Sequence, residues 1–308
     1  MESDQPRATS DAEGSATNAS LSDIPSAEAA FREVNDLTQH VVVAGNPEDP
    51  LVILLHGFPE FWYEWHDYIE PFVDAGYRVL VPDQRGYNRS EKPAGIRPYR
   101  ITELSQDIVD LIATENRDSA HVIGHDWGAA VGWDLALRHP DTVDRLGIIN
   151  VPHPTVFERV LRSNLRQLRN SWYMFFFQLP RFPEWCIGRN DYDFLVTAMR
   201  EGARSETFSE SDFERYRRAW AEEGALTAML NWYRALLRHS ERPPRERVQA
   251  PTLIVWGEHD QALVPEMAPK SLDYCEEGTL ERFSQATHWI SHEYPDRVST
   301  LLLDHLGS

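Results

Sequence analysis

The sequence predicts an α/β protein with a mostly parallel, twisted sheet that is flanked by helices and carries an inserted helical lid. Two observations support this. Continuous apolar runs at 51–55 and 253–256 are typical of buried parallel strands, and each leads into a polar loop that contains glycine. Between residues 152 and 245, the alternation of strands and helices gives way to helical patterns rich in Arg and aromatic residues. We therefore expect one sheet whose chain is interrupted by a lid.

Local patterns predict the other elements of the sheet and its helices. In chain order, we expect a strand at 37–44, a turn at 46–50, a short buried strand at 78–81, a helix at 102–115 and a strand at 143–150. Thr102 is the expected N-cap of that helix. Ala250-Pro251 restarts the sheet after the lid. Parallel strands joined by helices place the loops at their carboxyl ends on one edge of the sheet, where ligands bind in such folds.

The chain is expected to divide into four segments. Residues 1–27 are rich in Ser, Ala, Thr, Asp and Glu, and they lack the basic start and apolar core of a signal peptide, so we expect a disordered acidic tail. The core is expected to comprise 28–151 and 246–308, and the lid 152–245. With 308 residues and 42% hydrophobic side chains, the chain can bury one large core plus a lid rather than two independent domains.

A candidate nucleophile lies in the segment Gly124-His125-Asp126-Trp127-Gly128. This segment follows a strand-like run at 120–123 and leads into a helix-like run at 129–138. The pattern is typical of a nucleophile elbow, a strained turn between strand and helix in which a serine usually projects from the sheet. Here the position holds Asp126. A carboxylate attacks electrophilic sp3 carbon and forms an ester intermediate, so the pattern favours epoxide opening or halide displacement over ester or peptide hydrolysis.

Three further segments can complete a catalytic site around Asp126. The backbone N–H groups of Phe58, in His56-Gly57-Phe58-Pro59, and of Trp127 are the expected oxyanion-hole donors. Asp260 and His288 are the expected acid and histidine, because the order of nucleophile, acid and histidine fits this architecture. The alternative is a loop acid and a surface histidine, since the chain holds 12 histidines and 49 acids. Their positions after predicted strands favour catalysis.

On these motifs, together with the segment 83–90, the chain resembles the α/β-hydrolase superfamily and, within it, the epoxide hydrolases, from about Phe31 to the C-terminus. Two lid segments, 172–178 and 231–234, are similar to family segments that carry catalytic tyrosines. The resemblance implies that Tyr173 and Tyr233 donate hydrogen bonds to the epoxide oxygen, which leaves as a poorly stabilised alkoxide. The alternative is that both tyrosines belong to an aromatic core.

Other functions are open for a fold with this nucleophile. Haloalkane dehalogenases resemble the chain, and Trp127 could donate an N–H to a halide, but Phe58 replaces the asparagine that many of them carry. Fluoroacetate dehalogenases also resemble it, yet they typically carry an arginine where Trp127 stands. A ligand-binding member of the fold without catalysis is the most distant alternative, and the complete set of Asp126, Asp260 and His288 counts against it.

The remaining candidate residues fall into three groups. The aromatic residues near the oxyanion loop and in the lid are expected to line an apolar pocket, with Trp62, Trp172 and Phe176 as the substrate-binding residues and Trp65, Phe175 and Trp185 as further wall residues. Residues expected to satisfy buried polar groups are His56, Asp83, Arg85 and Ser90. His125 is expected to line the turn, and no role is expected for His239, His259, His292 and His305.

Composition limits the class of partner and the location. No segment approaches the ~18 apolar residues that would span a bilayer. Only Cys186 and Cys275 are present, far apart, so we expect no disulfide framework and a cytoplasmic, reducing location. The expected partners are a small epoxide and water, and no step of the expected reaction requires a cofactor or a metal. The sequence leaves open whether the chain forms homo-oligomers.

The charge of the chain is strongly negative. Its 49 acidic residues exceed its 30 basic residues, the net charge is −19, and the only lysines are Lys92 and Lys270. This balance argues against nucleic acid as a partner. An acidic, lysine-poor surface is similar to that of halophilic archaeal proteins, so we expect an enzyme from a salt-adapted organism. A GC-rich genome could explain the preference for Arg over Lys, but not the excess of acids.

Overall fold

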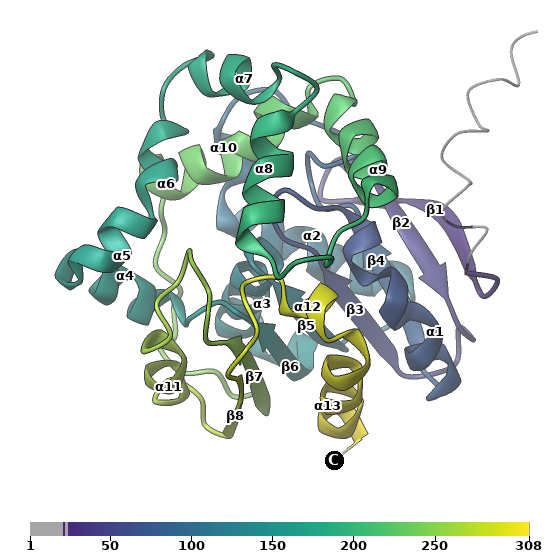
Figure 1. Cartoon of the computed structure of the whole chain (residues 1–308). Helices are drawn as coiled ribbons and strands as arrows, with labels where there is room; N and C mark the ends of the chain where they lie inside the picture. The colour runs from purple at the N-terminus through teal and green to yellow at the C-terminus, as the bar shows by residue number, and fades with distance from the viewer. Residues whose placement is uncertain (1–20, 22–23, 308) are drawn as a thin grey trace, which may run out of the picture.

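The computed structural model describes residue 21 and residues 24–307, and these build an eight-stranded sheet (Figure 1). The strands lie in the order β1-β2-β4-β3-β5-β6-β7-β8. Their bounds are β1 (Ala27–Val34), β2 (Leu37–Ala44), β3 (Leu51–Leu55), β4 (Arg78–Pro82), β5 (Ala120–His125), β6 (Val143–Ile149), β7 (Thr252–Gly257) and β8 (Gly278–Phe283). Strand β2 is antiparallel to β1 and β4. The strands that follow in the sheet, in the order β4-β3-β5-β6-β7-β8, all pair in parallel.

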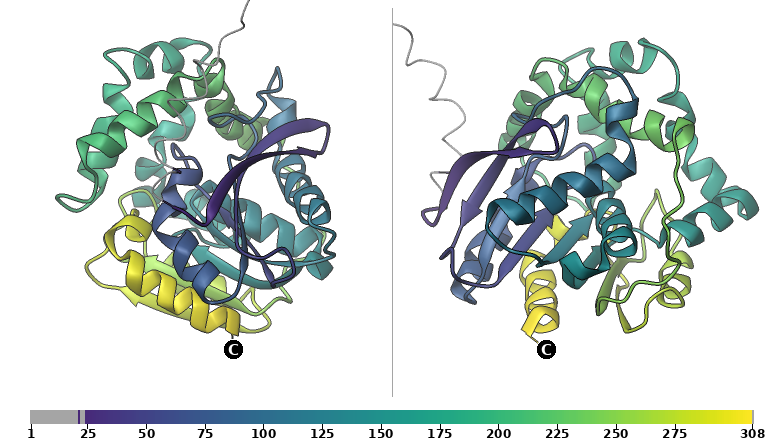
Figure 2. Two further views of the ribbon diagram at one scale, coloured as in Figure 1. Left: turned by 90° about the vertical axis from the view of Figure 1, so that its right-hand side faces the viewer. Right: turned by 180° about the vertical axis from the view of Figure 1, so that it is seen from behind.

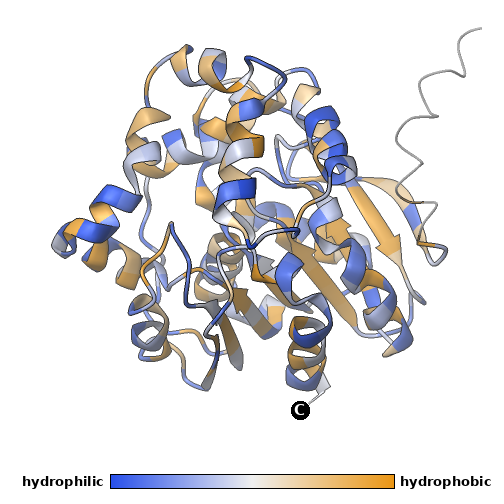
Figure 3. Cartoon of the chain, in the orientation of Figure 1, coloured by the Kyte–Doolittle hydropathy of each residue, from blue (hydrophilic) through white to orange (hydrophobic). Residues whose placement is uncertain are grey.

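The central strands form because they are apolar on both faces. All residues of β3 and β7 are buried, and Figure 3 shows the strands as mainly hydrophobic and the outward sides of the helices as hydrophilic. A strand that is covered on both faces has no polar side, which explains the continuous apolar runs in the sequence. The predictions for 51–55, 253–256, 37–44, 78–81 and 143–150 are confirmed within one or two residues.

Helices cover both faces of the sheet (Figure 2). Helices α2 and α3 contact each other, and α3 packs on β3, β5 and β6, whereas α1 and α13 contact each other and pack on β4, β6 and β7. The helices and 3-10 turns of the core are η2 (Trp62–Trp65), α1 (His66–Asp74), η3 (Arg97–Tyr99), α2 (Ile101–Thr114), α3 (Trp127–Arg138), η4 (Pro140–Thr142), α11 (Met267–Leu272), α12 (Ile290–Glu293) and α13 (Pro295–Gly307). None of the helices in the described part of the chain is long and apolar enough to cross a membrane.

The chain between β6 and β7 is helical, and the structure describes all of it. Its elements are α4 (Pro154–Ser163), α5 (Leu165–Asn170), α6 (Trp172–Phe176), α7 (Phe182–Ile187), α8 (Asp193–Gly202), α9 (Glu210–Ala221) and α10 (Ala225–Arg238). Figure 1 shows α6 to α10 above the sheet. We propose that this helical insertion, within the predicted limits 152–245, acts as a lid on the site below it.

Hydrogen bonds from the insertion hold it on the loops of the core. The Trp220 indole N–H of α9 donates to the Pro59 carbonyl at 2.5 Å, and the Trp232 indole N–H of α10 donates to the Arg85 carbonyl at 3.0 Å. Both indole rings are buried, so each donor needs an acceptor inside the protein. The two bonds fix α9 and α10 to the loops that follow β3 and β4.

Three details differ from the sequence predictions. Strand β1 was not expected, because half of its residues are exposed at the sheet edge and its sequence shows no apolar alternation. Its start at Ala27 falls one residue inside the predicted tail, most of which lies outside the described residues. Thr102 is not the N-cap of α2, so that prediction is wrong: the helix begins at Ile101, with Arg100 at the N-cap and no side-chain cap. From the sequence alone, His288 is expected after a strand that is given no residue range; this strand is β8, which is partly exposed.

Candidate active site

Asp126 lies in a strained turn between β5 and α3, as the elbow pattern predicts. Its backbone has φ 47° and ψ −121°, a conformation that residues other than glycine rarely adopt. The flanking glycines allow the turn to pack closely. A Cβ atom at Gly124 would lie 2.3 Å from the Gly128 carbonyl oxygen, and one at Gly128 would lie 2.0 Å from the Leu55 carbonyl oxygen. Any side chain at either position would therefore push the nucleophile out of place.

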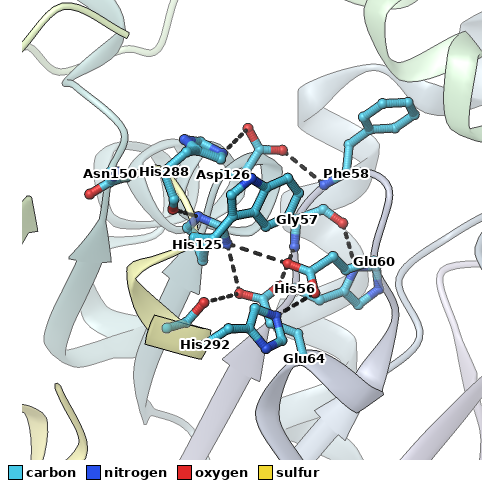
Figure 4. A network of polar contacts seen from close by, with 12 residues as sticks. His56, Gly57, Phe58, Glu60, Glu64, His125, Asp126, Asn150, His288 and His292 are labelled. Atoms are coloured by element: carbon cyan, nitrogen blue, oxygen red, sulfur yellow. Dashed lines mark hydrogen bonds and ion pairs between the residues drawn. The ribbon is translucent and has the colours of Figure 1, made fainter. Parts of the chain in front are cut away.

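The Asp126 carboxylate faces a backbone donor in the loop after β3 and the ring of His288 (Figure 4). Its Oδ1 accepts the Phe58 backbone N–H at 2.8 Å, and its Oδ2 lies 3.6 Å from His288 Nε2. Burial would raise the pKa of Asp126, but the hydrogen bond and charge of His288 outweigh burial and lower it. The carboxylate is therefore ionised at neutral pH, which is the form in which a carboxylate can attack an electrophilic carbon.

Asp260 orients His288 and is itself held on both oxygens. The His288 Nδ1 lies 2.7 Å from Asp260 Oδ2, and Oδ1 accepts the backbone N–H groups of Ala262 and Leu263 at 2.7 and 2.8 Å. Asp260 is almost fully buried, at 2% exposure. An acid held in this way keeps its orientation, so it binds the Nδ1–H of His288 and directs Nε2 at Asp126.

The protonation of His288 depends on the charge of Asp126. Burial would lower the pKa of His288, but Asp260 and Asp126 together raise it well above the ordinary value for histidine. In the free enzyme the ring is therefore a cation between two carboxylates. If Asp126 becomes an ester, one of these two negative charges disappears, and the pKa of His288 falls.

Tyr173 and Tyr233 come together from two helices of the insertion. Their ring centroids are 5.7 Å apart, and both pack on Phe177, while the Tyr233 ring also lies 5.2 Å from that of Phe58. Burial, followed by the negative charge of Asp126, raises the pKa of both phenols. Both tyrosines therefore stay protonated at neutral pH. Tyr233 packs on Phe58, whose backbone N–H binds Asp126, so the pair lies on the same side of the site as that N–H group.

Comparison with known proteins identifies the family. The family model of the alpha/beta hydrolase fold matches residues 50–295. The chain is 36% identical to epoxide hydrolase 4 of Mus musculus over 275 residues, which cover 85% of this chain and 74% of that protein. The chain belongs to the epoxide hydrolase family of the α/β-hydrolase superfamily. It is also 47% identical to the AB hydrolase superfamily protein YfhM of Bacillus subtilis, over 90% of this chain and 96% of that protein.

Solved structures of the epoxide hydrolase family share the whole fold. A variant of an epoxide hydrolase from Bacillus megaterium, crystallised with its product, a naphthyloxy-propane-1,2-diol, has a TM-score of 0.84 and 30% sequence identity. The match covers 91% of this chain and all of that chain. The predicted α/β-hydrolase fold with a mostly parallel sheet is therefore confirmed.

The expected substrate-binding residues occupy different environments in this family member. Trp62 is 3% exposed, its ring packs on Phe61 and Tyr63, and its backbone N–H donates to Asp83. Trp172 is 55% exposed and packs on Phe176, which is partly buried. The other expected wall residues also differ: Trp65 is fully buried, and Phe175 and Trp185 are about half exposed. The roles of all these residues in binding remain predictions.

The residues expected to be structural do hold the loops around the site. His56 accepts the Gln84 backbone N–H on Nε2 at 3.0 Å, which links the oxyanion loop to the loop after β4. Asp83 lies 2.7 Å from the His40 ring, and Ser90 donates its hydroxyl to the Asp83 carbonyl. Arg85 forms a buried two-pronged ion pair with Asp107 at 2.8 and 2.5 Å. These contacts satisfy polar groups that would otherwise be costly to bury.

Sequence reasoning missed Asn150, which directly follows β6. Its side-chain N–H group donates to Asp260 Oδ2 at 2.9 Å and to the Thr287 carbonyl at 3.1 Å, and its Oδ1 accepts the Gly257 N–H at 2.7 Å. The backbone of Asn150 has φ 53°, which asparagine tolerates better than most residues. The signal in the sequence was its position at the carboxyl end of a predicted strand.

Proposed function

We propose that this protein hydrolyses an epoxide to a vicinal diol through an ester on Asp126. The observation that carries the proposal is the arrangement of Asp126, held between the Phe58 N–H and His288, with the tyrosine pair, whose rings pack on each other and, through Tyr233, on Phe58. A carboxylate opens an sp3 carbon, and a pair of O–H donors serves a leaving oxygen that develops negative charge. The names of the relatives and the diol product of the Bacillus megaterium enzyme support the same reaction.

In the first step, Asp126 Oδ2 attacks a ring carbon of the epoxide. Oδ2 is the attacking oxygen because Oδ1 is held by the Phe58 N–H. The carbon–oxygen bond of the ring breaks, and its electron pair stays on the former ring oxygen, which takes a proton from the Tyr173 and Tyr233 pair. The product of this step is a hydroxyalkyl ester of Asp126, in which Oδ1 has become the carbonyl oxygen.

In the second step, His288 activates water against the ester. Loss of the Asp126 charge lowers the pKa of His288, so His288 releases a proton to solvent. A proton from solvent then restores the tyrosine pair, which gave one to the leaving oxygen. Neutral His288 then takes a proton from water, whose oxygen attacks the ester carbonyl carbon. The Phe58 and Trp127 N–H groups stabilise the negative charge on Oδ1. Collapse breaks the bond between the carbonyl carbon and Oδ2, and Oδ2 leaves as a hydroxyl of the diol with the proton that His288 took from water. The carboxylic acid left on Asp126 then gives its proton to His288, which restores the starting carboxylate and cation.

The side chain of Trp127 argues against halide as the leaving group. Its indole ring packs on Trp232 and Tyr233, with centroids 5.4 and 5.1 Å apart, and the pKa of Tyr233 reflects a hydrogen bond with the Trp127 side chain. We infer that the indole N–H is directed at the phenol, which leaves it poorly placed to hold a halide. In this arrangement Trp127 orients Tyr233, which strengthens the assignment of the tyrosine pair to an oxygen leaving group.

The proposed substrate carries an apolar substituent. The aromatic residues Trp172, Phe175, Phe176 and Trp185 lie in the helical insertion, and three of them are about half exposed. The naphthyl group of the Bacillus megaterium product shows that a related enzyme accepts a fused aromatic ring. Aryl epoxides, with styrene oxide as the simplest, are therefore the first substrates to test.

Mass spectrometry of the intact protein tests this function directly. His288→Gln mixed with styrene oxide should gain the mass of one epoxide, because the ester forms and cannot be hydrolysed, whereas Asp126→Asn should gain nothing. The wild-type protein should convert styrene oxide to its diol and release chloride or bromide from alkyl halides more slowly. An unmodified His288→Gln protein with a confirmed substrate would contradict the two-step scheme, and faster halide release would identify a dehalogenase.

A further inference from the structure

A buried polar network lies directly under the catalytic residues (Figure 4). It contains two carboxylic side chains, Glu60 and Glu64, which follow the oxyanion loop, and two imidazoles, His125 and His292. Glu60, Glu64 and His125 are at most 1% exposed, and the His292 side chain is 8% exposed. Four titratable groups at this depth need a defined arrangement of protons, because each unpaired charge would be costly. From the sequence alone, no role is expected for His292 and only a lining role for His125.

One pair in the network is an ordinary ion pair. His292 Nε2 lies 2.7 Å from Glu60 Oε2, which also accepts the hydroxyl of Tyr216 from α9. Burial would lower the pKa of His292, but Glu60 raises it to about 9. Burial would raise the pKa of Glu60, but His292 lowers it. Glu60 is therefore a carboxylate and His292 a cation at neutral pH.

The second pair requires an additional proton. His125 Nε2 lies 2.9 Å from the His288 carbonyl oxygen, which can only accept, so Nε2 carries a hydrogen. His125 Nδ1 lies 2.7 Å from Glu64 Oε1. A hydrogen on Nδ1, fixed in the plane of the ring, would nevertheless form no well-aligned hydrogen bond with that oxygen. A carboxyl O–H can instead rotate toward the ring nitrogen. Burial and the charge of Glu60 raise the pKa of Glu64 by more than His125 and His292 lower it, in agreement with a proton on its carboxyl group.

A proton fits this position better than a metal ion. Glu60, Glu64 and His125 each offer a ligand atom, and these atoms lie within 4.8 Å of one another. Two ligands of one ion at about 2.1 Å would lie roughly 3.0 to 3.4 Å apart. The 2.7 Å between His125 Nδ1 and Glu64 Oε1 is instead a hydrogen-bond length. The second oxygen of Glu64 is also occupied, because it accepts the Gly57 N–H.

Glu64 connects the two groups that act in the second step. Its Oε2 accepts the Gly57 N–H at 2.8 Å, next to the Phe58 N–H that holds Asp126. Its Oε1 reaches the His288 backbone through His125. We propose that Glu64, with a proton on its carboxyl group, is a positioning residue that fixes His288 relative to the oxyanion loop for hydrolysis of the ester. The inference rests on the proposed function, because it assigns Glu64 to the second step of that reaction.

Two substitutions test whether Glu64 acts through the hydrogen bonds of its protonated form. Glu64→Gln keeps an acceptor for the Gly57 N–H and supplies an N–H donor for His125 Nδ1, as the protonated acid does. Glu64→Leu fills a similar volume and supplies neither. Single-turnover measurements with an aryl epoxide then give the rates of ester formation and of ester hydrolysis. A shift of about 1 Å in a reacting group can cost roughly 100-fold in rate, so a loss of that order is the expected upper range.

We expect Glu64→Gln to hydrolyse the ester within about threefold of the wild-type rate, and Glu64→Leu to hydrolyse it roughly 10 to 100 times more slowly. Formation of the ester should change much less in both variants, so Glu64→Leu should accumulate the adduct. Asp134→Leu is the matched control, because Asp134 is a buried carboxyl of raised pKa, bound to Ser105 and Arg138 away from the network. This control should leave the ratio of the two rates unchanged.

An infrared spectrum tests the proton independently of activity. At neutral pH the wild-type protein should show the carbonyl stretch of a protonated carboxylic acid that is lost in Glu64→Gln. If Glu64→Leu does not fold, Glu64→Asp, which is too short to reach both Gly57 and His125, replaces it. Absence of the infrared band, slow hydrolysis in Glu64→Gln, or an unchanged rate ratio in Glu64→Leu would each overturn the inference. Absence of epoxide turnover in the wild-type protein would instead refute the proposed function, and the infrared test would still apply.

Discussion

Replacement of Asn150 by alanine should destabilise the protein by an amount that the structure allows us to estimate. The change leaves the Gly257 N–H and the Thr287 carbonyl buried without the partner that Asn150 provides. Each such group costs about 1–3 kcal/mol, so the expected loss from these two groups is roughly 2–6 kcal/mol. At about 2 °C per kcal/mol for a chain of this length, the melting temperature should fall by roughly 4–12 °C.

The backbone of Asn150 adds a second cost that must be separated from the first. Its φ of 53° disfavours alanine by about 1–2 kcal/mol. Asn116 provides the matched control, because it has φ 57° but lies exposed after α2. Asn116→Ala should therefore show the backbone cost alone, and the difference between the two variants isolates the buried hydrogen bonds.

The assay is chemical denaturation of Asn150→Ala, Asn116→Ala and the wild-type protein, followed by single-turnover kinetics with an aryl epoxide. Asn150→Ala should also slow hydrolysis of the ester, because Asp260 loses one of the donors that fix its orientation toward His288. If the two variants differ in free energy of unfolding by less than about 0.5 kcal/mol, the buried hydrogen bonds of Asn150 do not have the role assigned to them.

Three further outcomes test the chemistry and the charge. Tyr173→Phe and Tyr233→Phe should each slow ester formation by roughly 10- to 1,000-fold, and the double variant by more, with little change in melting temperature. If the double variant forms the ester at the wild-type rate, both tyrosines only line the pocket. Ester hydrolysis should rise with pH through the pKa of His288 in the ester, and this midpoint should lie below the pKa of His288 in the free enzyme, measured by NMR, because Asp126 no longer raises it. The melting temperature should rise between 0.1 and 2 M potassium chloride, by roughly a few degrees, since salt screens the 19 excess negative charges; a flat or falling curve would remove the inference of salt adaptation.

The parts of the site that could be predicted from the sequence are those with a local pattern. Asp126 stands between two glycines after an apolar run, and the structure shows why both glycines are needed: a Cβ atom at either would collide with backbone. Strands β3 and β7 were predicted because burial on both faces leaves a continuous apolar run. Strand β1 was not predicted, because an exposed strand at the edge of a sheet needs no continuous apolar run.

The parts that could not be predicted depend on contacts between distant segments. Asn150 acts through Asp260 and Thr287, 110 and 137 positions away, and an isolated asparagine after a strand is equally typical of a turn. Glu60 and Glu64 have the spacing of charges on a solvent-exposed helical turn. They are buried because α12 and the helical insertion cover them, with His292 and Tyr216 as partners of Glu60. No local pattern indicates that a carboxyl group will find such partners.

The site divides into two sides that correspond to the two steps of the proposed reaction. On the side of the helical insertion, Tyr173 and Tyr233 are proposed to act only while an oxygen is leaving the substrate. On the side of the sheet, Asn150 and Glu64 fix His288 and the oxyanion loop, which act only once the ester exists. Because Asp126 carries charge in the first step and none in the second, it changes the pKa of His288 between them. Substitutions on the insertion side should therefore slow ester formation, and substitutions on the sheet side should slow ester hydrolysis, so the level of adduct at steady state distinguishes the two sides.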